Sequence, residues 1–519
     1  MKIIFYILIT ISLVPYTFSQ TTFQRTYTCS NAVFQSGSVT NGVYVEQTFD
    51  SGYFVAGTIN VNMSDFFLMK VNNNGDTLWT KTFGGNFTEL LYSAKQTSDS
   101  GFILAGVTNS FSQGATDGYL IKTDVSGNII WSKNYGGFDN DWFESIDETD
   151  DGNFIACGST YTYGAGAHDV YLVKISSNGN IIWTKTIGSP QYDSGRDVQQ
   201  TVDKGFVITG YTNGFTAATS RIYVIKTDST GSVIWTKIFG GVIGEDTKCI
   251  RQCFDGGYAI SGYTNSYGAG ATDIFLLKLD INGNFQWMKT YGGASEEIGN
   301  DIEQTSDSGF ILTGRTYTFG GTERYVYMIK TNSSGDTLWT KAYQSSICNG
   351  YSVKQTYDGG YINASVPASL LLIKTDAFGN SGCNDISTNT IVSSVTPLQL
   401  SGYQTGSGGT AGTAGTLIRY IPITLDTLCI SLIGVKEIYE PEAIIYPNPS
   451  LNLFTVELKN SHNDSRILLY NSQGILVSEQ NSKYKKIVIN RNGLASGLYF
   501  VEIIEDGKII FNSRVFFID

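Results

Sequence analysis

Short runs in which apolar and polar residues alternate recur along most of the 519-residue chain, and polar turns separate them. Residues 145–149, 154–157, 170–174 and 181–185 are four successive runs of this kind. Alternation with a period of two is typical of β-strands, and the period of an amphipathic helix is absent. The 58 glycines, 32 tyrosines and 29 phenylalanines also favour strands and tight turns. The predicted fold class is therefore all-β.

A repeat of 52 residues organises these strands. Six equally spaced tryptophans mark it: Trp79, Trp131, Trp183, Trp235, Trp287 and Trp339. A lysine stands nine positions before each tryptophan, and a glycine stands four positions before it. An aspartate recurs in the turn between the first two strands of each unit, at Asp50, Asp99, Asp151, Asp203, Asp255, Asp307 and Asp358. Four strands joined by tight turns in a unit of this length are typical of one blade of a β-propeller.

The repeats predict a ring that closes on itself. Seven sets of first, second and third strands can be counted, but Cys383 occupies the seventh tryptophan position, so one fourth strand is missing. Residues 23–27 match the fourth-strand pattern of residues 287–291, and they are expected to supply the outer strand of the last blade. Residues 21–380 are thus predicted to form a seven-bladed β-propeller closed by the N-terminal strand, because closure leaves no unpaired inner edge.

Residues 226–235 resemble the tryptophan-docking motif of quinoprotein-like β-propellers, in which an Asp/Thr/Gly turn leads to a tryptophan packed on the neighbouring blade. The resemblance implies the fold and leaves the function open, because the motif also occurs in propellers that bind no quinone. The repeated tryptophans and lysines are interpreted as packing between blades, with each lysine stem lying on apolar surface.

The start of the chain has the features of an export signal. Lys2, the apolar residues 3–14 and the sequence before Gln20 are typical of a secretory signal peptide, which is predicted over residues 1–20. No later stretch has the 18 or more apolar residues of a membrane-spanning helix, so no transmembrane segment is expected.

Residues 381–440 are predicted to be a Gly/Thr-rich linker. The apolar segments 395–403 and 417–425 are expected to pair as a β-hairpin around a flexible glycine-rich tract. Cys383 and Cys429 could bridge the ends of this hairpin.

Residues 441–519 alternate in a pattern that predicts a small β-sandwich. Three segments resemble the successive signature motifs of the C-terminal sorting domain of the type IX secretion (Por) system. They contain, in chain order, Pro447, Asn448 and Pro449, then Gly474, then Gly497 and Tyr499. The resemblance implies that the type IX machinery is a partner and that the protein is secreted or attached to the outer cell surface.

Charge and side-chain chemistry exclude several functions. A net charge of -12 argues against a nucleic-acid partner, because phosphate binding requires clustered lysine and arginine. With two histidines and no nucleophile elbow, phosphate-binding loop or zinc-ligand spacing, the sequence predicts no catalytic residue, no metal site and no cofactor. Calcium on the acidic loops is the one cation left open. An enzyme is therefore less favoured than a binding protein.

Two sets of side chains recur in the longer loops, where ligand binding in a propeller is most expected. An acidic residue recurs at Glu89, Asp141, Asp193, Glu245 and Glu297. An aromatic residue recurs at Phe111, Tyr163, Phe215, Tyr267 and Phe319. Together they could bind a cation or stack on sugar rings. The alternative is structural: the acid hydrogen-bonds the backbone of its own loop, and the aromatic packs on the next blade.

Residues that depart from the repeat are better candidates for a ligand site. Trp142 has no counterpart in the other units, and its surroundings supply further polar and aromatic side chains: Asp139, Asp141, Tyr161, Tyr163, His168 and Tyr192. Such a cluster could stack on a glycan or a peptide, or Trp142 could simply anchor its own loop.

Three functions remain in view at this point. The leading hypothesis is a non-enzymatic module for adhesion that binds a glycan or a protein outside the cell. The alternative is a hydrolase or lyase that acts on extracellular polysaccharide through the acids of the longer loops. Quinone-dependent oxidation is a third hypothesis, and it rests only on the tryptophan-docking resemblance.

Overall fold

The computed structural model divides into two compact units, residues Met1–Gly434 and Val435–Asp519. Strands make up both units, and no helix occurs among the described residues. Residues 1–19 of the predicted signal peptide and the motif residues Pro447, Asn448, Pro449 and Gly474 lie outside the described residues. The described residues are 20–29, 33–34, 43–60, 63–214, 219–321, 323–344, 348–366, 369–400, 402, 404–406, 408, 410–413, 417–419, 424–433, 443–446, 452–458, 465–471, 475–505 and 508–517.

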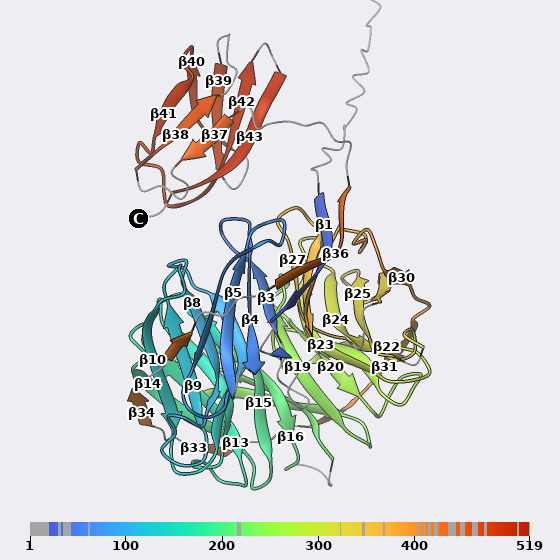
Figure 1. The fold of residues 1–519 in the computed structure, drawn as a ribbon. Coiled ribbons are helices and arrows are strands. Elements are labelled where there is room, and N and C mark those ends of the chain that lie inside the picture. The colour runs from blue at the N-terminus through green and yellow to red at the C-terminus, as the bar shows by residue number, and fades with distance from the viewer. Residues whose placement is uncertain are drawn as a thin grey trace, which may run out of the picture. The chain divides into compact units, whose positions relative to one another are not determined.

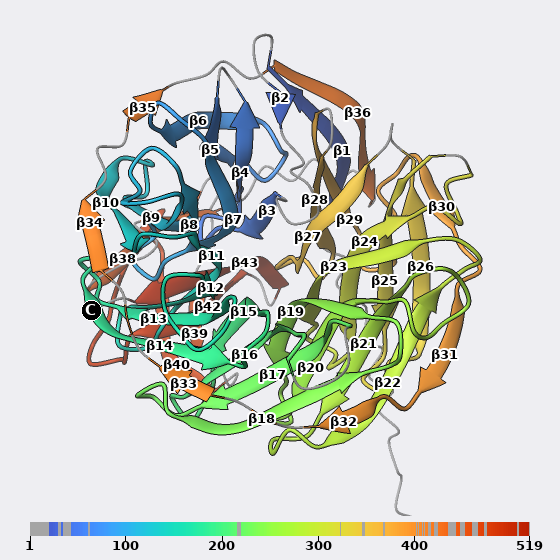
Figure 2. The same ribbon diagram turned by 90° about the horizontal axis from the view of Figure 1, so that it is seen from below.

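The described part of the first unit consists of seven antiparallel sheets (Figure 1), arranged around a common centre (Figure 2). In one of them, β11 (Asp141–Glu148), β12 (Phe154–Thr160), β13 (Asp169–Ile175) and β14 (Ile181–Gly188) pair in chain order. Each such set corresponds to one sequence repeat. The other sets are β3 (Tyr44–Gln47), β4 (Tyr53–Asn60), β5 (Ser64–Val71) and β6 (Thr77–Gly84), with the short β2 (Val33–Phe34) beside β4; β7 (Glu89–Gln96), β8 (Phe102–Thr108), β9 (Asp117–Thr123) and β10 (Ile129–Gly136); β15 (Asp193–Gln200), β16 (Phe206–Thr212), β17 (Arg221–Thr227) and β18 (Val233–Gly240); β19 (Glu245–Gln252), β20 (Tyr258–Thr264), β21 (Asp273–Leu279) and β22 (Phe285–Gly292); β23 (Glu297–Gln304), β24 (Phe310–Thr316), β25 (Tyr325–Thr331) and β26 (Thr337–Tyr343); and β27 (Asn349–Gln355), β28 (Tyr361–Val366) and β29 (Leu370–Thr375).

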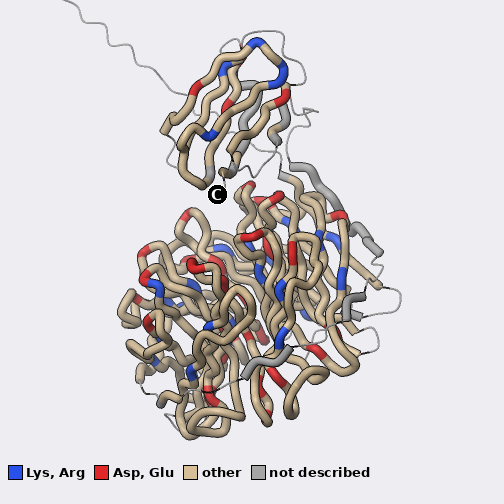
Figure 3. The backbone as a smooth tube through the Cα atoms, turned by 90° about the vertical axis from the view of Figure 1, so that its left-hand side faces the viewer, with Lys and Arg blue, Asp and Glu red and all other residues tan. Residues whose placement is uncertain are grey.

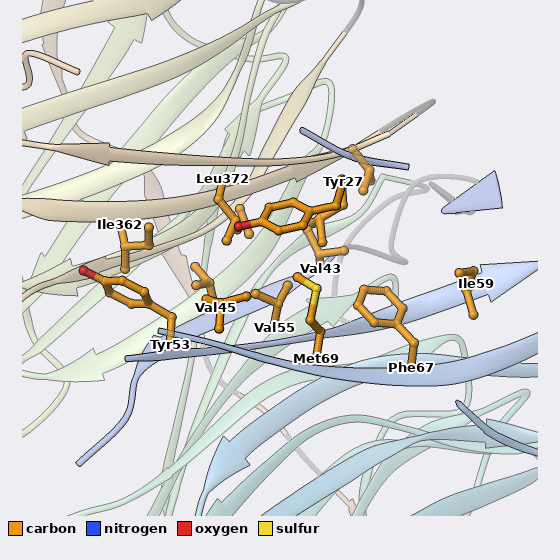
Figure 4. Packing of buried hydrophobic residues seen from close by; sticks show 14 of the residues in the cluster. Tyr27, Val43, Val45, Tyr53, Val55, Ile59, Phe67, Met69, Ile362 and Leu372 are labelled. Carbon is orange, nitrogen blue, oxygen red and sulfur yellow. The ribbon is translucent and has the colours of Figure 1, made fainter. Parts of the chain in front are cut away.

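The N-terminal strand β1 (Gln20–Thr28) pairs with β29, with Phe23 opposite Lys374 and Tyr27 opposite Leu370. It also contacts the β3–β6 sheet, because the hydroxyl of Tyr27 donates to the carbonyl of Gly75 at 2.5 Å. Figure 4 shows Tyr27, Ile362 and Leu372 packed with residues of β3, β4 and β5 in one buried cluster. The first and last repeats of the chain are therefore neighbours.

Hydrogen bonds link the innermost strands in a cycle. In each sheet a Gln or Glu at the end of the first strand accepts a hydrogen bond from a backbone N–H in the first turn of another sheet. The acceptors are Gln47, Gln96, Glu148, Gln200, Gln252, Gln304 and Gln355, and the N···O distances lie between 2.7 and 3.1 Å. Gln47 accepts from Tyr357, so the series returns to its starting sheet.

The repeated tryptophans pack on the neighbouring sheet. A Cβ on Gly231 would lie 2.8 Å from Cη2 of Trp183, and the φ of this glycine is +76°. Both the close approach and the left-handed backbone require glycine at this turn. This contact explains why the glycine and tryptophan columns share one period.

The repeated lysines have a different role from the one expected. Each buried lysine pairs with the turn aspartate of its own sheet at 2.8 to 3.1 Å, in the pairs Lys70–Asp50, Lys122–Asp99, Lys174–Asp151, Lys226–Asp203, Lys278–Asp255, Lys330–Asp307 and Lys374–Asp358. A buried ammonium group is stable only with such a counter-charge. The stem therefore serves to place a charge, rather than only to cover apolar surface.

The predicted linker hairpin is wrong. The last part of the first unit instead contributes one strand to the outer edge of each sheet, shown around the rim in Figure 2. These seven strands, here called the belt, are β30 (Asp385–Ser387), β31 (Ile391–Val395), β32 (Leu398–Leu400), β33 (Gln404–Gly406), β34 (Thr410–Thr413), β35 (Leu417–Arg419) and β36 (Thr424–Ile433).

The belt strands pair with the outermost strand of each sheet in reverse chain order. Strand β30 pairs with β26, β32 with β18 and β35 with β6, so the two halves of the expected hairpin lie on different sheets. Strand β36 pairs with β1, which is therefore not the outer strand that the sequence predicted. The physical reason is that an uncovered edge strand exposes unpaired backbone groups, and the belt covers them.

Both ends of the belt meet at β1. Gln24 in β1 donates to Ser381 Oγ at 2.9 Å and to the carbonyl of Cys383 at 2.6 Å. Cys383 is disulfide-bonded, whereas Cys29, Cys157, Cys249 and Cys253 are free thiols. Cys429, which the sequence suggests as its partner, lies opposite Gln24 in β36, where the side chains are not described.

The second unit contains two sheets with one shared core. The strands β37 (Ala443–Tyr446), β38 (Leu453–Leu458) and β41 (Lys486–Asn490) form the first sheet, and β39 (Ser465–Asn471), β40 (Leu476–Ser482), β42 (Gly497–Glu505) and β43 (Lys508–Phe517) form the second. Phe454 and Val456 of one sheet and Val501 and Phe517 of the other belong to one buried cluster. Tyr499 is also part of it, and its hydroxyl donates to the carbonyl of Ala495 at 2.9 Å.

Candidate ligand-binding site

The recurring loop acids are buried and hydrogen-bonded within their own loops. Glu89, Asp141, Asp193, Glu245 and Glu297 are each at most 1% exposed. Each accepts a hydrogen bond from the backbone N–H four positions earlier, at 2.6 to 3.1 Å. These acids therefore stabilise the backbone of their own loops, which was the second interpretation of the sequence pattern. Buried carboxylates of this kind cannot contact an external ligand.

Aromatic side chains gather around His168, between the β11–β14 and β15–β18 sheets. The ring of His168 lies 5.0 Å from Tyr161, 5.8 Å from Trp142 and 5.0 Å from Tyr192, measured between centroids. His168 is buried, whereas Tyr161 is 42% and Tyr192 is 44% exposed. This aromatic cluster brings together four of the residues that the sequence singled out.

His168 holds the cluster in place. Its Nδ1 lies 2.7 Å from the carbonyl oxygen of Asp193, and a parallel bridge links the backbones of His168 and Tyr192. Burial lowers the pKa of His168 below its usual value, so the imidazole is neutral at pH 7. A neutral ring in contact with three aromatic rings serves to position them.

Three other predicted residues lie outside the cluster. Asp139 is exposed and contributes only a backbone bond, to Thr162 Oγ1. The hydroxyl of Tyr163 donates to the carbonyl of Gly136 at 3.0 Å, and its ring packs against the hydrophobic core. Asp141 accepts hydrogen bonds from the backbone N–H of Gly137 and from the hydroxyl of Thr162, so it stabilises its own loop like the other recurring acids.

A charged network lies beside the aromatic cluster. Trp142 Nε1 donates to Glu144 Oε1 at 3.1 Å, and the same oxygen pairs with Arg196 Nη1 at 2.8 Å. Arg196 also approaches Asp246 at 3.4 Å, and Asp246 pairs with Lys248 at 2.8 Å. Burial opposes charge here, but Arg196 and Lys248 outweigh it and lower the pKa of Asp246. Asp246 is therefore charged at neutral pH despite its burial.

Two further tyrosines extend the aromatic surface along this network. The guanidinium of Arg196 lies 5.2 Å from the ring centre of Tyr211, and the ammonium of Lys248 lies 5.6 Å from that of Tyr263. These distances are within the range of cation–π attraction. Tyr211 also lies 6.2 Å from His168, which joins the two groups of rings.

A β-bulge directs the charged side chains toward the centre of the sheets. The register of six first strands skips one residue, at Tyr92, Glu144, Arg196, Lys248, Asn300 and Tyr351. A bulge re-aims one side chain without disturbing the rest of the strand. Five residue types occupy these six positions, because only tyrosine occurs twice.

A central cavity of about 300 Å³ lies among the first strands. Its lining includes the bulge residues Arg196, Lys248, Asn300 and Tyr351, together with Glu46, Lys95, Arg251 and Asp301 from positions farther along the strands. In the view of Figure 3, acidic and basic residues are interspersed over the first unit. Because its lining residues include both acids and bases, the cavity is polar and contains charges of both signs.

The described residues contain no cluster of three or more His, Cys, Asp or Glu side chains that could hold a metal ion. They also contain no helix of the length and apolarity needed to cross a membrane. Sequence reasoning missed Glu144, Arg196, Tyr211, Asp246, Lys248 and Tyr263. Glu144, Arg196 and Lys248 stand at a position of the repeat where the residue type varies, and this variation could have identified them. The bulge that directs their side chains cannot be recognised from the sequence, because it is a shift in hydrogen-bond register.

The comparison with protein families concerns the second unit. Residues 444–515 match the family model of the secretion system C-terminal sorting domain. The second unit is a type IX sorting domain. It is recognised by the type IX secretion machinery, and it marks the chain for export and for secretion or attachment to the cell surface. No curated relative matches the sequence.

Two solved structures have distant likeness to the chain. One is PorZ of Porphyromonas gingivalis, described as an essential bacterial surface component of the type IX secretion system, with 13% identity, a TM-score of 0.38, and 91% of this chain and 60% of that chain covered. The other is the extracellular domain of a protein described as a hybrid two-component system from B. thetaiotaomicron, with 11% identity, a TM-score of 0.24, and 92% and 80% covered. The chain thus spans about 60% of the length of PorZ. These TM-scores are too low to support an inference about this chain.

Proposed function

We propose that this exported protein is a non-enzymatic carbohydrate-binding module, built as a closed seven-bladed β-propeller that carries its site at the aromatic cluster. The observation that supports the ligand class is the pair of exposed rings, Tyr161 and Tyr192, held with Trp142 around a buried histidine. Sugar rings have apolar C–H faces that stack on such side chains.

Two contacts support the closed ring. The cycle of seven hydrogen bonds includes one between Gln47 and Tyr357, which belong to the first and last repeats. The contact of Tyr27 with Gly75 repeats one made elsewhere by Tyr135 with Gly179, so β1 acts as a fourth strand toward the first repeat. A ring of this kind holds the loops of neighbouring sheets in fixed positions, as a preformed site requires.

The charged network supports recognition of hydroxyl groups. Glu144, Arg196 and Asp246 hold one another in place, so their remaining lone pairs and N–H groups are oriented before a ligand arrives. Hydroxyl groups of sugars both donate and accept, and a network of both kinds of group suits them. Polysaccharide cleavage by the recurring acids receives no support, because these carboxylates are buried and bonded to their own loops.

The test is binding of the purified full-length protein to a panel of bacterial and host glycans. We expect at least one glycan to bind, and we expect Trp142→Ala and Tyr192→Ala each to weaken it by roughly tenfold or more, since one stacking aromatic contributes about 1.5 kcal/mol. Phe378→Ala removes an exposed aromatic at the turn end of the sheets and should leave binding unchanged.

Absence of binding across the panel would contradict the proposal. So would binding that survives both substitutions in the aromatic cluster. If a protein ligand bound through the same residues while every glycan failed, the site would stand and the ligand class would be wrong.

A further inference from the structure

Four junctions between neighbouring sheets bring two buried carboxylates together. One pair is Asp65 with Glu89. In the other three the aspartate is the first residue of its strand, and these pairs are Asp117 with Asp141, Asp169 with Asp193, and Asp273 with Glu297. The first member begins the third strand of one sheet, and the second begins the first strand of the next sheet. All six residues of these three pairs are at most 1% exposed. The second pair adjoins the aromatic cluster, because His168 Nδ1 lies 2.7 Å from the carbonyl oxygen of Asp193.

A glycine at the end of the fourth strand lies between the members of each pair. A Cβ on Gly136 would lie 2.4 Å from Asp117 Oδ1 and 2.7 Å from Asp141 Oδ2. The corresponding distances are 1.9 and 2.9 Å at Gly188 for Asp169 Oδ1 and Asp193 Oδ2, and 1.8 and 2.7 Å at Gly292 for Asp273 Oδ1 and Glu297 Oε2. The two carboxylates thus occupy the space that any other side chain would fill.

In each of these three pairs the first-named aspartate has one oxygen without a hydrogen-bond donor: Asp117 Oδ1, Asp169 Oδ1 and Asp273 Oδ1 are buried without a partner. In the first two pairs the facing acid also has such an oxygen, Asp141 Oδ1 and Asp193 Oδ1. The other oxygen of each first-named aspartate is satisfied; Asp117 Oδ2, for example, accepts from Asn134 Nδ2 at 2.6 Å. Within the described part of the chain, no lysine or arginine forms an ion pair with any of the six acids. Two adjacent anions buried in this way would repel each other without compensation.

Equivalent junctions in the same chain show what replaces a pair. Arg221 begins β17 where β9, β13 and β21 begin with aspartate, and it faces the side of Gly240 that Glu245 also contacts. At the junction of β25 and β27 the two positions hold Tyr325 and Asn349, and both are uncharged. Glu245, which has no second acid opposite it, faces the cation Arg221. The junctions without a cation contain either two acids or no acid.

We propose that each of the three pairs holds one proton at neutral pH, shared between the aspartate Oδ1 and the facing carboxylate. The O–H···O bond satisfies the otherwise unpartnered oxygen and joins two neighbouring sheets. A hydrogen bond to a carboxylate is among the strong ones in proteins. A proton fits these sites better than a metal ion does, because backbone N–H donors and not carbonyl oxygens surround the carboxylates.

Burial is also the main reason that the pKa values of Asp117, Asp169 and Asp273 are raised, and the facing acid adds to the effect. The other titratable groups that face the pairs are Tyr163, Tyr171, Tyr327 and His168. Burial raises the pKa of Tyr171 and Tyr327 and lowers that of His168, so these three are neutral at pH 7. The positive charge of Arg196 lowers the pKa of His168 further. Arg315 forms an ion pair with Glu296, beside the third junction.

The sign of the pH dependence follows. A carboxyl group whose pKa is raised in the folded state stabilises the fold fully at a pH below the ordinary carboxyl pKa of about 4. That contribution is lost as the pH rises through the raised value. The sheets should therefore separate more easily in mild alkali than in mild acid.

The test compares thermal unfolding of the full-length protein at pH 5.5 and pH 8.5 in the presence of a chelator. We expect the wild-type midpoint to fall with rising pH by roughly 2–4 °C for each pair. In Asp117→Asn, Asp169→Asn and Asp273→Asn, singly and combined, the amide N–H replaces the shared proton at every pH. Each variant should therefore lose its share of the fall. Asp139→Asn alters an exposed aspartate on the same end of the sheets and is the matched control.

A wild-type midpoint that does not change with pH, or variants that keep the full slope, would overturn the proposal. Calcium that binds stoichiometrically and restores the alkaline midpoint would also overturn it, because a metal ion would then balance the charge. Infrared spectroscopy of wild-type protein with carbon-13 in its aspartates needs no variant: a band of protonated carboxyl groups at pH 7 supports the proposal, and its absence refutes it.

Discussion

Aspartates lie at both ends of most sheets of the first unit, and the two ends give them opposite properties. At the turn end, hydrogen bonds from the turn and from a buried lysine outweigh burial and lower the pKa of Asp50, Asp99, Asp151, Asp203, Asp255 and Asp307. At the loop end, burial raises the pKa of Asp117, Asp141, Asp169, Asp193 and Asp273. The partner of a repeated acid, and not its repetition, decides what the acid does.

The two ends also differ in uniformity. The lysine–aspartate pair and the hydrogen bond from the first turn are present in all seven sheets. At the loop end, Arg221, Asn349 and Trp142 each break the pattern in one sheet. The uniform contacts link neighbouring sheets, and the departures from them provide the surface on which recognition can differ from one sheet to the next.

At the turn end, the largest loss of stability is expected when one of the paired carboxylates is removed. Asp203→Asn leaves Lys226, whose side chain is 4% exposed, without its counter-charge. We expect a loss of about 2 kcal/mol in the free energy of unfolding, below the roughly 3–5 kcal/mol of a wholly buried pair because Asp203 is 56% exposed. Chemical denaturation measures it.

Lys226→Met provides the comparison for that variant. It leaves a half-exposed aspartate that water can solvate, so it should cost only about 1 kcal/mol. A larger loss for Lys226→Met than for Asp203→Asn would show that the pair does not act through the buried ammonium group.

The pH dependence of the turn end should be opposite to that of the loop end. Because the folded-state pKa of Asp203 is lowered, its contribution is present above the ordinary carboxyl range and is lost as the pH falls through the lowered value. Between pH 5 and pH 3 the wild type should lose roughly 0.5 kcal/mol more than Asp203→Asn, after allowance for solvent screening. Denaturant titrations across this range test the difference, and equal losses would contradict it.

The smallest effect on stability is expected at the exposed surface of the aromatic cluster. Tyr192→Ala removes a side chain that is 44% exposed, so the free energy of unfolding should change by less than about 0.5 kcal/mol even where glycan binding is lost. Stability and binding measured on the same preparation separate the two roles. A loss of several kcal/mol would mean that Tyr192 supports the fold instead.

The sequence allowed the repeated sheets to be predicted because their markers are local. Trp183 and Gly231 stand at a fixed spacing, and they do so because the ring of one packs on the turn of the next sheet. Residues 23–27 were recognisable for the same reason, since β1 follows the fourth-strand pattern. Contacts that recur with the repeat leave a periodic trace.

The belt and half of the candidate site left no such trace. Strands such as β32 and β35 are three residues long, and pairing with an existing edge imposes little on their side chains. Arg196 and Lys248 are directed inward by a bulge, which depends on hydrogen-bond register and not on residue type. Tyr161, His168 and Tyr192 could be grouped in advance because they lie in loops next to Trp142, which departs from the repeat.

The belt also has a consequence for the order in which the protein matures. Translation produces every outer edge before the segment that covers it, and the last covering strand ends at Ile433, immediately before the sorting domain begins. A polypeptide cut short anywhere in the belt therefore lacks the C-terminal sorting domain as well. Only molecules that contain all seven belt strands also contain the sorting domain. The order of segments in the chain therefore limits export to molecules that can cover every sheet edge.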